Sequence, residues 1–165
     1  LLFCVVLLAA SVAAAQGKVD SSWTCKPGMT HSMDTGDMPG HSYMIGQSKC
    51  TATKGTIDGV AEKEGLDTNF SEVTGNTSKG HGFFLETMAN GDKLHVKYDT
   101  EGTSKDGKFQ TGTDKWWVVD GTGKFKGGKG SGSCSRKSNA DGSVTWTCTG
   151  TYNAPKAAAK APAKK

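Results

Sequence analysis

The stretch from Asp114 to Tyr152 constrains the fold more than any other part of this 165-residue chain. It opens with Lys115–Val119, a run of aromatic and β-branched residues that is typical of a strand. Glycines then recur too densely between positions 121 and 130 for a helix to form. We therefore expect a strand that ends in a tight turn, with Phe125 pointing inward.

The remainder of this stretch predicts a β-hairpin. Ala140-Asp141-Gly142 suits a three-residue loop in which Gly142 takes the left-handed position. If Asn139 faces Ser143, Cys134 lies opposite Cys148, close enough for a disulfide. The same register places one set of side chains on a core face (Val144, Trp146, Cys148) and another on the opposite face (Thr145, Thr147, Thr149, Thr151).

The cysteine count supports disulfide bonding. Cys4 lies in an apolar N-terminal run, and four cysteines remain, an even number in a chain that we expect to be exported to an oxidising compartment. Three pairings are possible. The hairpin geometry favours Cys134–Cys148, and Cys25–Cys50 follows by elimination. Each bridge would stabilise the fold by roughly 3 kcal/mol on the chain-entropy estimate.

Composition divides the chain into four segments. Residues 1–15 form an apolar run that is too short to span a bilayer and ends in small residues, which is typical of a secretory signal peptide. A leader at 16–22 and a folded domain at 23–153 follow, and 154–165 is an Ala/Pro/Lys tail with nothing to bury, which we expect to be disordered. The sequence therefore predicts a secreted or periplasmic protein that is not transmembrane.

A second hairpin is indicated between positions 83 and 98. Asn90-Gly91 is the preferred two-residue turn, which would pair Ala89 with Asp92. That register makes one face apolar (Phe83, Leu85, Thr87, Leu94, Val96, Tyr98) and the other mostly charged (Phe84, Glu86, Met88, Lys93, His95, Lys97). It places His95 opposite Glu86 on the outer face, where the two would form a solvated pair rather than a catalytic one.

Successive hairpins without an amphipathic helical period predict an all-β meander or barrel. Within it, we expect Trp23 to Met33 to be an edge strand or a strand with a bulge, because Pro27-Gly28 interrupts it. The tryptophans Trp23, Trp116, Trp117 and Trp146 are expected to pack in the core or at the barrel mouth.

The sequence WWVVDGTGKFKGGKGSG resembles the signature of the allene oxide cyclase barrel superfamily, which includes plant dirigent proteins and small secreted bacterial proteins. GDMPGHSYMIGQ (36–47) and NGDKLHVKY (90–98) resemble the early strand and the middle hairpin of the bacterial members. The likeness runs from about Met29 to Tyr152 and departs from the family at Asp120, at Gly128 and in the added cysteines. It implies an antiparallel closed barrel of about eight strands, similar to a lipocalin, around a small apolar pocket; a homo-oligomer is implied only by the same likeness.

Charge argues against a nucleic-acid-binding barrel. The formal charge is +4, and the tail alone supplies four lysines (Lys156, Lys160, Lys164 and Lys165). The remaining chain is therefore near neutral, whereas phosphate binding needs clustered Lys and Arg. Gly123 to Lys129 nearly spells a phosphate-binding loop, but residue 130 is glycine and a strand is expected to follow, so no helix N-terminus is available to bind phosphate.

Methionine and histidine are concentrated near the N-terminus of the folded domain. Thioether and imidazole groups together suit Cu(I), and Met38, His41 and Met44 have the M-x-x-H and H-x-x-M spacings of exported copper-handling proteins. The candidate copper ligands are Met29, His31, Met33, Met38, His41 and Met44. The alternative interpretation is structural, because methionine also fills irregular cores.

The sequence shows no assembled catalytic set and no resident cofactor other than this candidate copper site. We expect a non-catalytic binder of a small apolar ligand, or an accessory partner of an envelope protein. The first alternative is an isomerase or cyclase of the allene oxide cyclase type, which would need a carboxylate or histidine pointing into the barrel; Asp67, Glu72, Glu86 and Glu101 are candidates that the pattern does not separate. The second alternative is periplasmic copper binding.

Overall fold

The structure is a computed structural model that describes residues 16–155. Nine strands and one short 3-10 helix make up this region. In chain order they are β1 (Gly17–Asp34), β2 (His41–Lys54), β3 (Thr56–Ile57), β4 (Val60–Thr74), β5 (Thr77–Met88), β6 (Lys93–Lys105), β7 (Lys108–Gly121), η1 (Gly123–Phe125), β8 (Lys129–Ser138) and β9 (Val144–Asn153).

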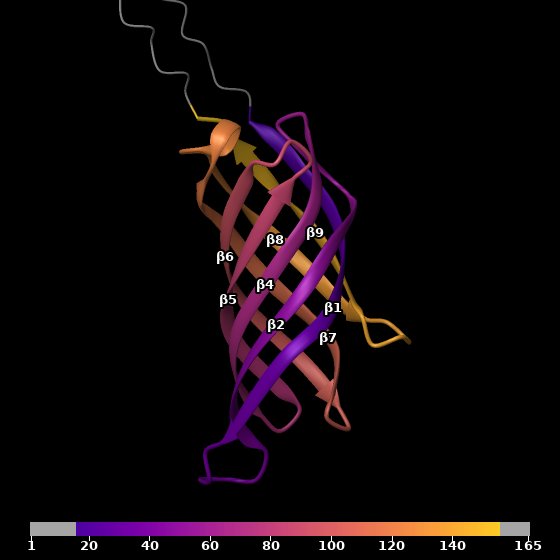
Figure 1. Cartoon of the computed structure of the whole chain (residues 1–165). Helices are drawn as coiled ribbons and strands as arrows, with labels where there is room; N and C mark the ends of the chain where they lie inside the picture. Colours follow the sequence, from indigo (N-terminus) through magenta and orange to yellow (C-terminus); the bar gives the residue numbers. More distant parts are fainter. Residues whose placement is uncertain (1–15, 156–165) are drawn as a thin grey trace, which may run out of the picture.

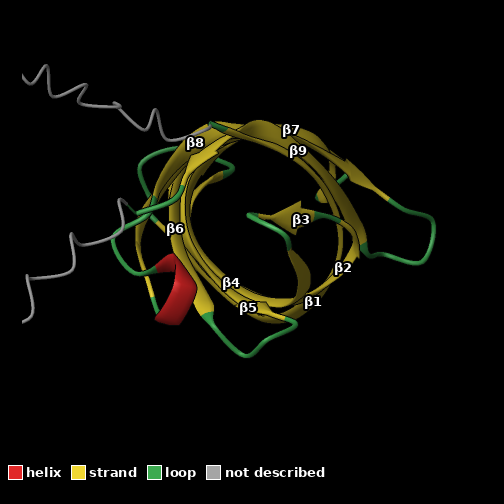
Figure 2. Cartoon of the chain, turned by 90° about the horizontal axis from the view of Figure 1, so that it is seen from above, coloured by secondary structure: helices red, strands yellow, loops and turns green. Residues whose placement is uncertain are grey.

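Eight of the strands close into an antiparallel barrel (Figures 1 and 2). The sheet runs in the order β2-β1-β9-β8-β7-β6-β5-β4, and β2 pairs with β4 to complete the ring. The extra strand β3 pairs only with β4 and lies within the ring seen from above (Figure 2). The fold class that the sequence predicted is confirmed.

The barrel begins earlier than the sequence predicted. Residues 17–22, predicted as part of a leader, form the first third of β1 and pair with β9 from Gly17 opposite Tyr152 onward. Ser21 and Val19 are buried, so this segment contributes side chains to the core. The predicted signal peptide and most of the predicted tail lie outside the described residues.

The predicted β8–β9 register is confirmed. Cys134 pairs with Cys148, and the loop is closed by hydrogen bonds from Asn139 N to Ser143 O and from Gly142 N to Asn139 O. Gly142 has a φ of 82°, as the three-residue loop requires. Trp146 and Cys148 are buried, so their side of the hairpin faces the barrel interior.

The predicted β5–β6 register is wrong by one residue. The loop has three residues rather than two, because Met88 N donates to Asp92 O and Gly91, at a φ of 87°, takes the left-handed bulge position. Glu86 therefore pairs with Leu94, and Leu85 with His95. Because side chains alternate between faces, this shift moves Glu86 from the predicted outer face into the barrel.

Aromatic side chains fill much of the barrel interior. Trp23 and Phe84 meet edge to face with ring centroids 5.0 Å apart, and Tyr98 meets Trp146 in the same way at 5.7 Å. Trp117 departs from the predicted core group, because it lies on the outer face and is 37% exposed. The fully or nearly buried apolar side chains include Val19, Met88, Leu94, Trp116, Val118, Phe125 and Tyr152.

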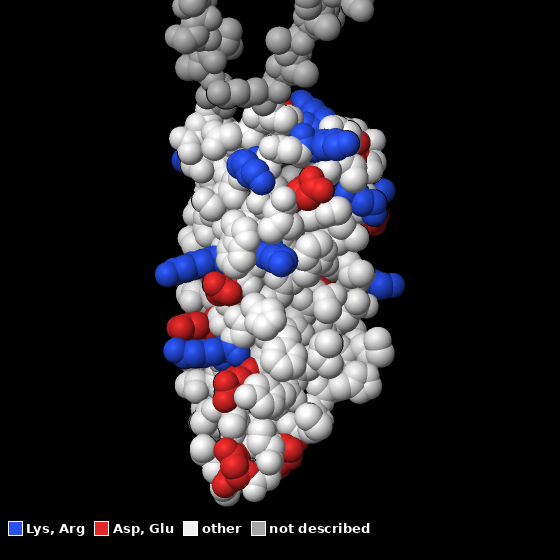
Figure 3. Space-filling view, turned by 90° about the vertical axis from the view of Figure 1, so that its left-hand side faces the viewer, with Lys and Arg blue, Asp and Glu red and all other residues white. Residues whose placement is uncertain are grey.

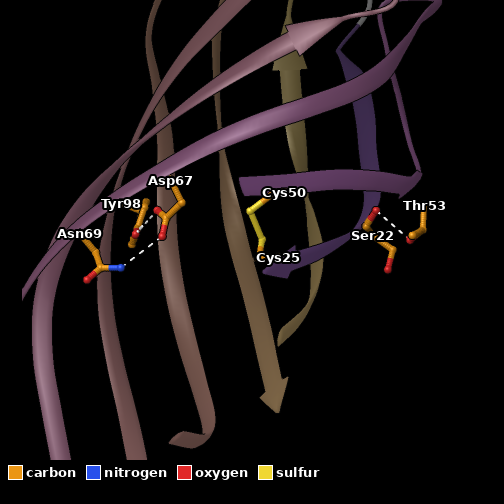
Figure 4. The surroundings of a disulfide bond; sticks show 7 residues. All are labelled: Ser22, Cys25, Cys50, Thr53, Asp67, Asn69 and Tyr98. Atoms are coloured by element: carbon orange, nitrogen blue, oxygen red, sulfur yellow. Dashed lines mark hydrogen bonds between the residues drawn. A yellow bond between two sulfur atoms is a disulfide. The ribbon is translucent and has the colours of Figure 1, made fainter. Parts of the chain in front are cut away.

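Two disulfides tie neighbouring strands together inside the barrel. Cys25–Cys50 joins β1 to β2 (Figure 4), and Cys134–Cys148 joins β8 to β9; these are the pairs expected from the sequence. All four cysteines are buried. On the outer surface, acidic and basic side chains are interspersed over the face shown in Figure 3. Within the described residues, no helix has the length and apolar character needed to cross a membrane.

We expect loss of the Cys134–Cys148 bridge, which spans 14 positions, to destabilise the protein by about 3 kcal/mol. The C134A/C148A double variant and the parent would be compared by urea unfolding under oxidising conditions. Thr149→Ala, an exposed change on the same strand, is the control and should fall within about 0.5 kcal/mol of the parent. A double variant as stable as the control would contradict this role for the bridge.

Candidate binding site in the barrel lumen

A partly enclosed cavity of about 60 Å³ lies inside the barrel. Its wall is mainly apolar and aromatic, because the inward-facing residues of β1, β5, β7 and β9 are large side chains. The lining includes Val19, Trp23, Ile57, Phe84, Leu94, Val96, Tyr98, Trp116, Val118, Trp146 and Tyr152, together with Ser21, Glu62, Glu86 and Asp114. The polar members of this set are few, and three of them are acidic.

Two glutamates share one side of the cavity. Glu62 comes from the start of β4 and Glu86 from the end of β5, and they are only 9% and 4% exposed. Ser21 Oγ donates a hydrogen bond of 2.7 Å to Glu62 Oε1. Glu62 Oε2 and Glu86 Oε1 are buried and, among the described residues, have no hydrogen-bond partner.

Burial changes the protonation of this pair. Removal from water raises the pKa of Glu62 to about 7, although the Ser21 hydrogen bond opposes the rise. The pKa of Glu86 lies well above its ordinary value because of burial and the neighbouring charge of Glu62. Glu86 lowers the pKa of Glu62 whereas Glu62 raises that of Glu86, so Glu86 is the carboxyl that keeps its proton more firmly. At neutral pH the pair therefore holds at least one proton.

A second polar group lies on the interior side of β4, β6, β7 and β8. Tyr98 OH donates to Asp67 Oδ1 at 2.5 Å, and Asn69 Nδ2 donates to Asp67 Oδ2 at 3.2 Å (Figure 4). Arg136 Nε lies 3.1 Å from Asp114 Oδ1, which is an ion pair by distance although the two atoms are not aligned as a hydrogen bond. Arg136 also donates to the Thr100 hydroxyl.

In this second group too, burial raises the carboxyl pKa values more than the neighbouring partners lower them. The pKa of Asp114 is raised to about 6 by burial, even though the Arg136 guanidinium lowers it. Burial likewise raises the pKa of Asp67 against its hydrogen bonds, and raises that of Tyr98. Arg136 stacks over Trp146, 5.5 Å from the ring centroid, so this guanidinium is held by protein contacts.

A short hairpin closes the cavity over Glu62. We call residues 55–60 the plug hairpin; it contains β3, and Ile57 inserts into the core at 6% exposure. At Gly55, with a φ of 148°, an added Cβ would lie 1.6 Å from Glu62 Oε2. Lys124 of η1 holds the hairpin tip through a 3.2 Å ion pair with Asp58 and a hydrogen bond to its carbonyl.

The predicted copper ligands are not arranged as the sequence suggested. His41 uses both ring nitrogens, with Asp37 at 2.7 Å and Glu72 at 2.8 Å, and these contacts raise its pKa. On β2, Met44 falls on the strand face of the buried Gly46 and Cys50, whereas His41 falls on the other face.

The remaining predicted ligands are largely solvent-exposed. Met29, Met33 and Met38 are 61%, 70% and 49% exposed, and His31 is also exposed. Among the described residues, no three His, Cys, Asp or Glu side chains are grouped to hold a metal ion. Copper binding stays a prediction that these positions do not favour.

The structure buries two of the four carboxylates that were named from the sequence and leaves the other two at the surface. Asp67 and Glu86 are buried, whereas Glu72 and Glu101 pair with His41 and Lys79 at the surface. The sequence patterns did not identify Glu62, Asp114 and Arg136 as residues of the barrel interior. The alternation Asp114-x-Trp116-x-Val118 could have placed Asp114 inward, but β4 has a register irregularity between Glu62 and Glu64 that breaks its alternation.

Comparison with known proteins adds little beyond the barrel itself. No family model matches the chain, and no curated protein matches it. Three solved structures are distantly similar. A pyocyanin demethylase is 14% identical, with 82% of this chain and 99% of that chain covered and a TM-score of 0.42. A pterocarpan synthase dirigent protein is 10% identical, with 90% of this chain and 97% of that chain covered and a TM-score of 0.46. A conserved protein of unknown function from Rhodopseudomonas palustris is 11% identical, with 86% of this chain and 99% of that chain covered and a TM-score of 0.44. At this level of similarity the fold rests on the strand order described above.

The buried glutamates predict a stability that falls as pH rises. Glu62 has a folded pKa of about 7 against an ordinary value of 4.5, so the folded state binds more protons than the unfolded state between these values. The free energy of unfolding should therefore decrease by about 3 kcal/mol from Glu62 alone between pH 4.5 and 7, at about 1.4 kcal/mol per pKa unit. Urea unfolding across this range measures the slope.

Glu62→Gln should flatten this slope, because the amide does not titrate, and Glu64→Gln, an exposed change on the same strand, should keep it. Identical pH profiles for the parent and the Glu62→Gln variant would show that Glu62 titrates normally.

Proposed function

We propose that the protein is an exported binder of a small, mainly apolar ligand held in the barrel lumen. The observation that carries this proposal is the lumen cavity, walled by aromatic rings and lined in part by Ile57 of the plug hairpin. Such sites combine apolar walls with a few placed polar groups, here Ser21, Glu62 and Glu86. Two disulfides support an extracellular or periplasmic location.

The size of the cavity limits the ligand. About 60 Å³ is well below the roughly 150 Å³ of an apolar cavity that takes a benzene molecule. A ligand of more than a few heavy atoms therefore requires the plug hairpin to move outward. The hairpin is suited to this because β3 has only two residues and pairs with one strand. The contacts of Lys124 with Asp58 would break in this movement.

A second candidate function is proton-transfer catalysis of the isomerase or cyclase type. The observation that favours it is the pair of lumen carboxyls whose pKa values lie near neutrality, about 7 for Glu62 and about 6 for Asp114. General acids and bases work best when their pKa is close to the working pH. The two candidates differ in whether the bound molecule leaves the barrel chemically changed.

A homologous series of 1-alkanols, from methanol to 1-hexanol, tests lumen binding. Each added methylene that enters the cavity should tighten binding about fourfold, from about 0.8 kcal/mol per buried CH₂, until the lumen is full and affinity levels off. Tryptophan fluorescence reports binding, since Trp23, Trp116 and Trp146 line the cavity.

Val118→Phe, which fills the lumen, should abolish this binding, and Lys115→Phe, on the outer side of the same strand, should not. The absence of saturable binding for every alkanol, or equal binding by both variants, would refute the lumen site.

A further inference from the structure

We infer that the polar end of the lumen ligand is a small organic cation, of the alkylammonium class, bound by Glu62 and Glu86. This inference rests on the proposed function, because it assumes that the lumen takes a ligand. It specifies which chemistry the polar side of the cavity recognises, and it rests on the charge balance, the unpartnered oxygens and the aromatic wall of that cavity.

The charge balance of the interior is strongly acidic. The buried charged side chains of residues 16–155 are Glu62, Asp67, Glu86 and Asp114, all carboxylic acids. Among these residues, Arg136 is the one basic side chain that reaches them, and it is occupied by Asp114, Thr100 and the ring of Trp146. The glutamate pair has no such cation. Within the described region, the side-chain donor that it receives is the Ser21 hydroxyl.

The Ser21 hydroxyl does not satisfy the pair. When only one carboxyl is protonated, the other carries a charge, and Glu62 Oε2 and Glu86 Oε1 are buried without a hydrogen-bond partner among the described residues. A buried charge without a partner is costly, and a cation placed next to it removes that cost. An ammonium group has three N–H donors, enough to reach both free oxygens.

The apolar side of the cavity suits the rest of such a ligand. Trp23 and Phe84, in edge-to-face contact at 5.0 Å, line the same cavity as the two glutamates. Aromatic ring faces attract cations, and the ring edges pack against alkyl chains. The plug hairpin lies directly over Glu62, so a cation bound there would be shielded from water by Gly55. Shielding strengthens the attraction between opposite charges.

Propylammonium and 1-propanol provide a matched pair of probes, because they have the same number of heavy atoms and differ in charge. Binding of each to the full chain would be measured at pH 8 by tryptophan fluorescence and calorimetry at constant ionic strength. An alkylamine keeps its proton at this pH, since its pKa is about 10.4, like that of lysine. We expect propylammonium to bind at least tenfold more tightly than 1-propanol.

The double variant Glu62→Gln/Glu86→Gln should lose the tenfold preference for propylammonium over 1-propanol, because the amides carry no charge. The control Glu64→Gln removes an exposed carboxylate from β4 and should keep the preference. Circular dichroism and unfolding curves confirm that each variant is folded.

The remaining outcomes distinguish the lumen binding site from its recognition of a cation. If the parent binds 1-propanol as tightly as propylammonium, recognition of a cation is refuted and the lumen site stands. A cation preference that survives in the double variant refutes the assignment to Glu62 and Glu86. If neither probe binds, both the proposed function and this inference fail.

Discussion

Pairing of β2 with β4 is the contact on which the rest of the structure depends. It joins the two ends of the main sheet and turns it into a closed ring with an inside that bulk water does not fill. Every inward side chain must then be apolar or find a polar partner. The disulfide Cys25–Cys50 fixes β2 to β1 near this seam, and Cys134–Cys148 does the same for β8 and β9.

Closure explains why carboxylates become the distinctive feature of the interior. In an open sheet, Glu62 and Glu86 would stay hydrated and ionise normally. In the closed barrel they face aromatic rings and each other, so burial raises the pKa of both. Asp67 and Asp114 meet the same environment but have Tyr98 and Arg136 as partners. Among the described residues, the glutamates on β4 and β5 thus keep buried oxygens without a hydrogen-bond partner and have no basic side chain beside them.

The sequence allows the strands to be predicted better than the faces they present. Ala140-Asp141-Gly142 identifies the three-residue loop correctly, and the β8–β9 register, its buried face and its disulfide follow from it. Asn90-Gly91 favours a two-residue turn, yet the chain uses Gly91 as the bulge residue of a three-residue loop. Both loops are compatible with the same dipeptide. Choosing between them decides whether Glu86 is on the surface or in the lumen.

Other parts of the site had no usable sequence signal. The irregularity between Glu62 and Glu64 interrupts the alternation of β4, and the plug hairpin is held by a contact with Lys124 from 66 positions along the chain. Local pattern does not report such distant contacts. The Met/His cluster is a sequence signal without a matching site in the structure. Its spacing is that of a copper site, but strand alternation places His41 and Met44 on opposite faces of β2. His41 is also bound by Asp37 and Glu72.

Direct observation of the glutamate carboxyl carbons tests the account at its centre. In a protein labelled with ¹³C at glutamate, the carboxyl resonances can be followed from pH 3 to pH 9, with those of Glu62 and Glu86 assigned through their glutamine variants. We expect Glu86 to remain protonated at neutral pH and Glu62 to titrate near 7. Titration of both Glu62 and Glu86 near the ordinary glutamate value of 4.5 would contradict the buried pair and the lumen site built on it.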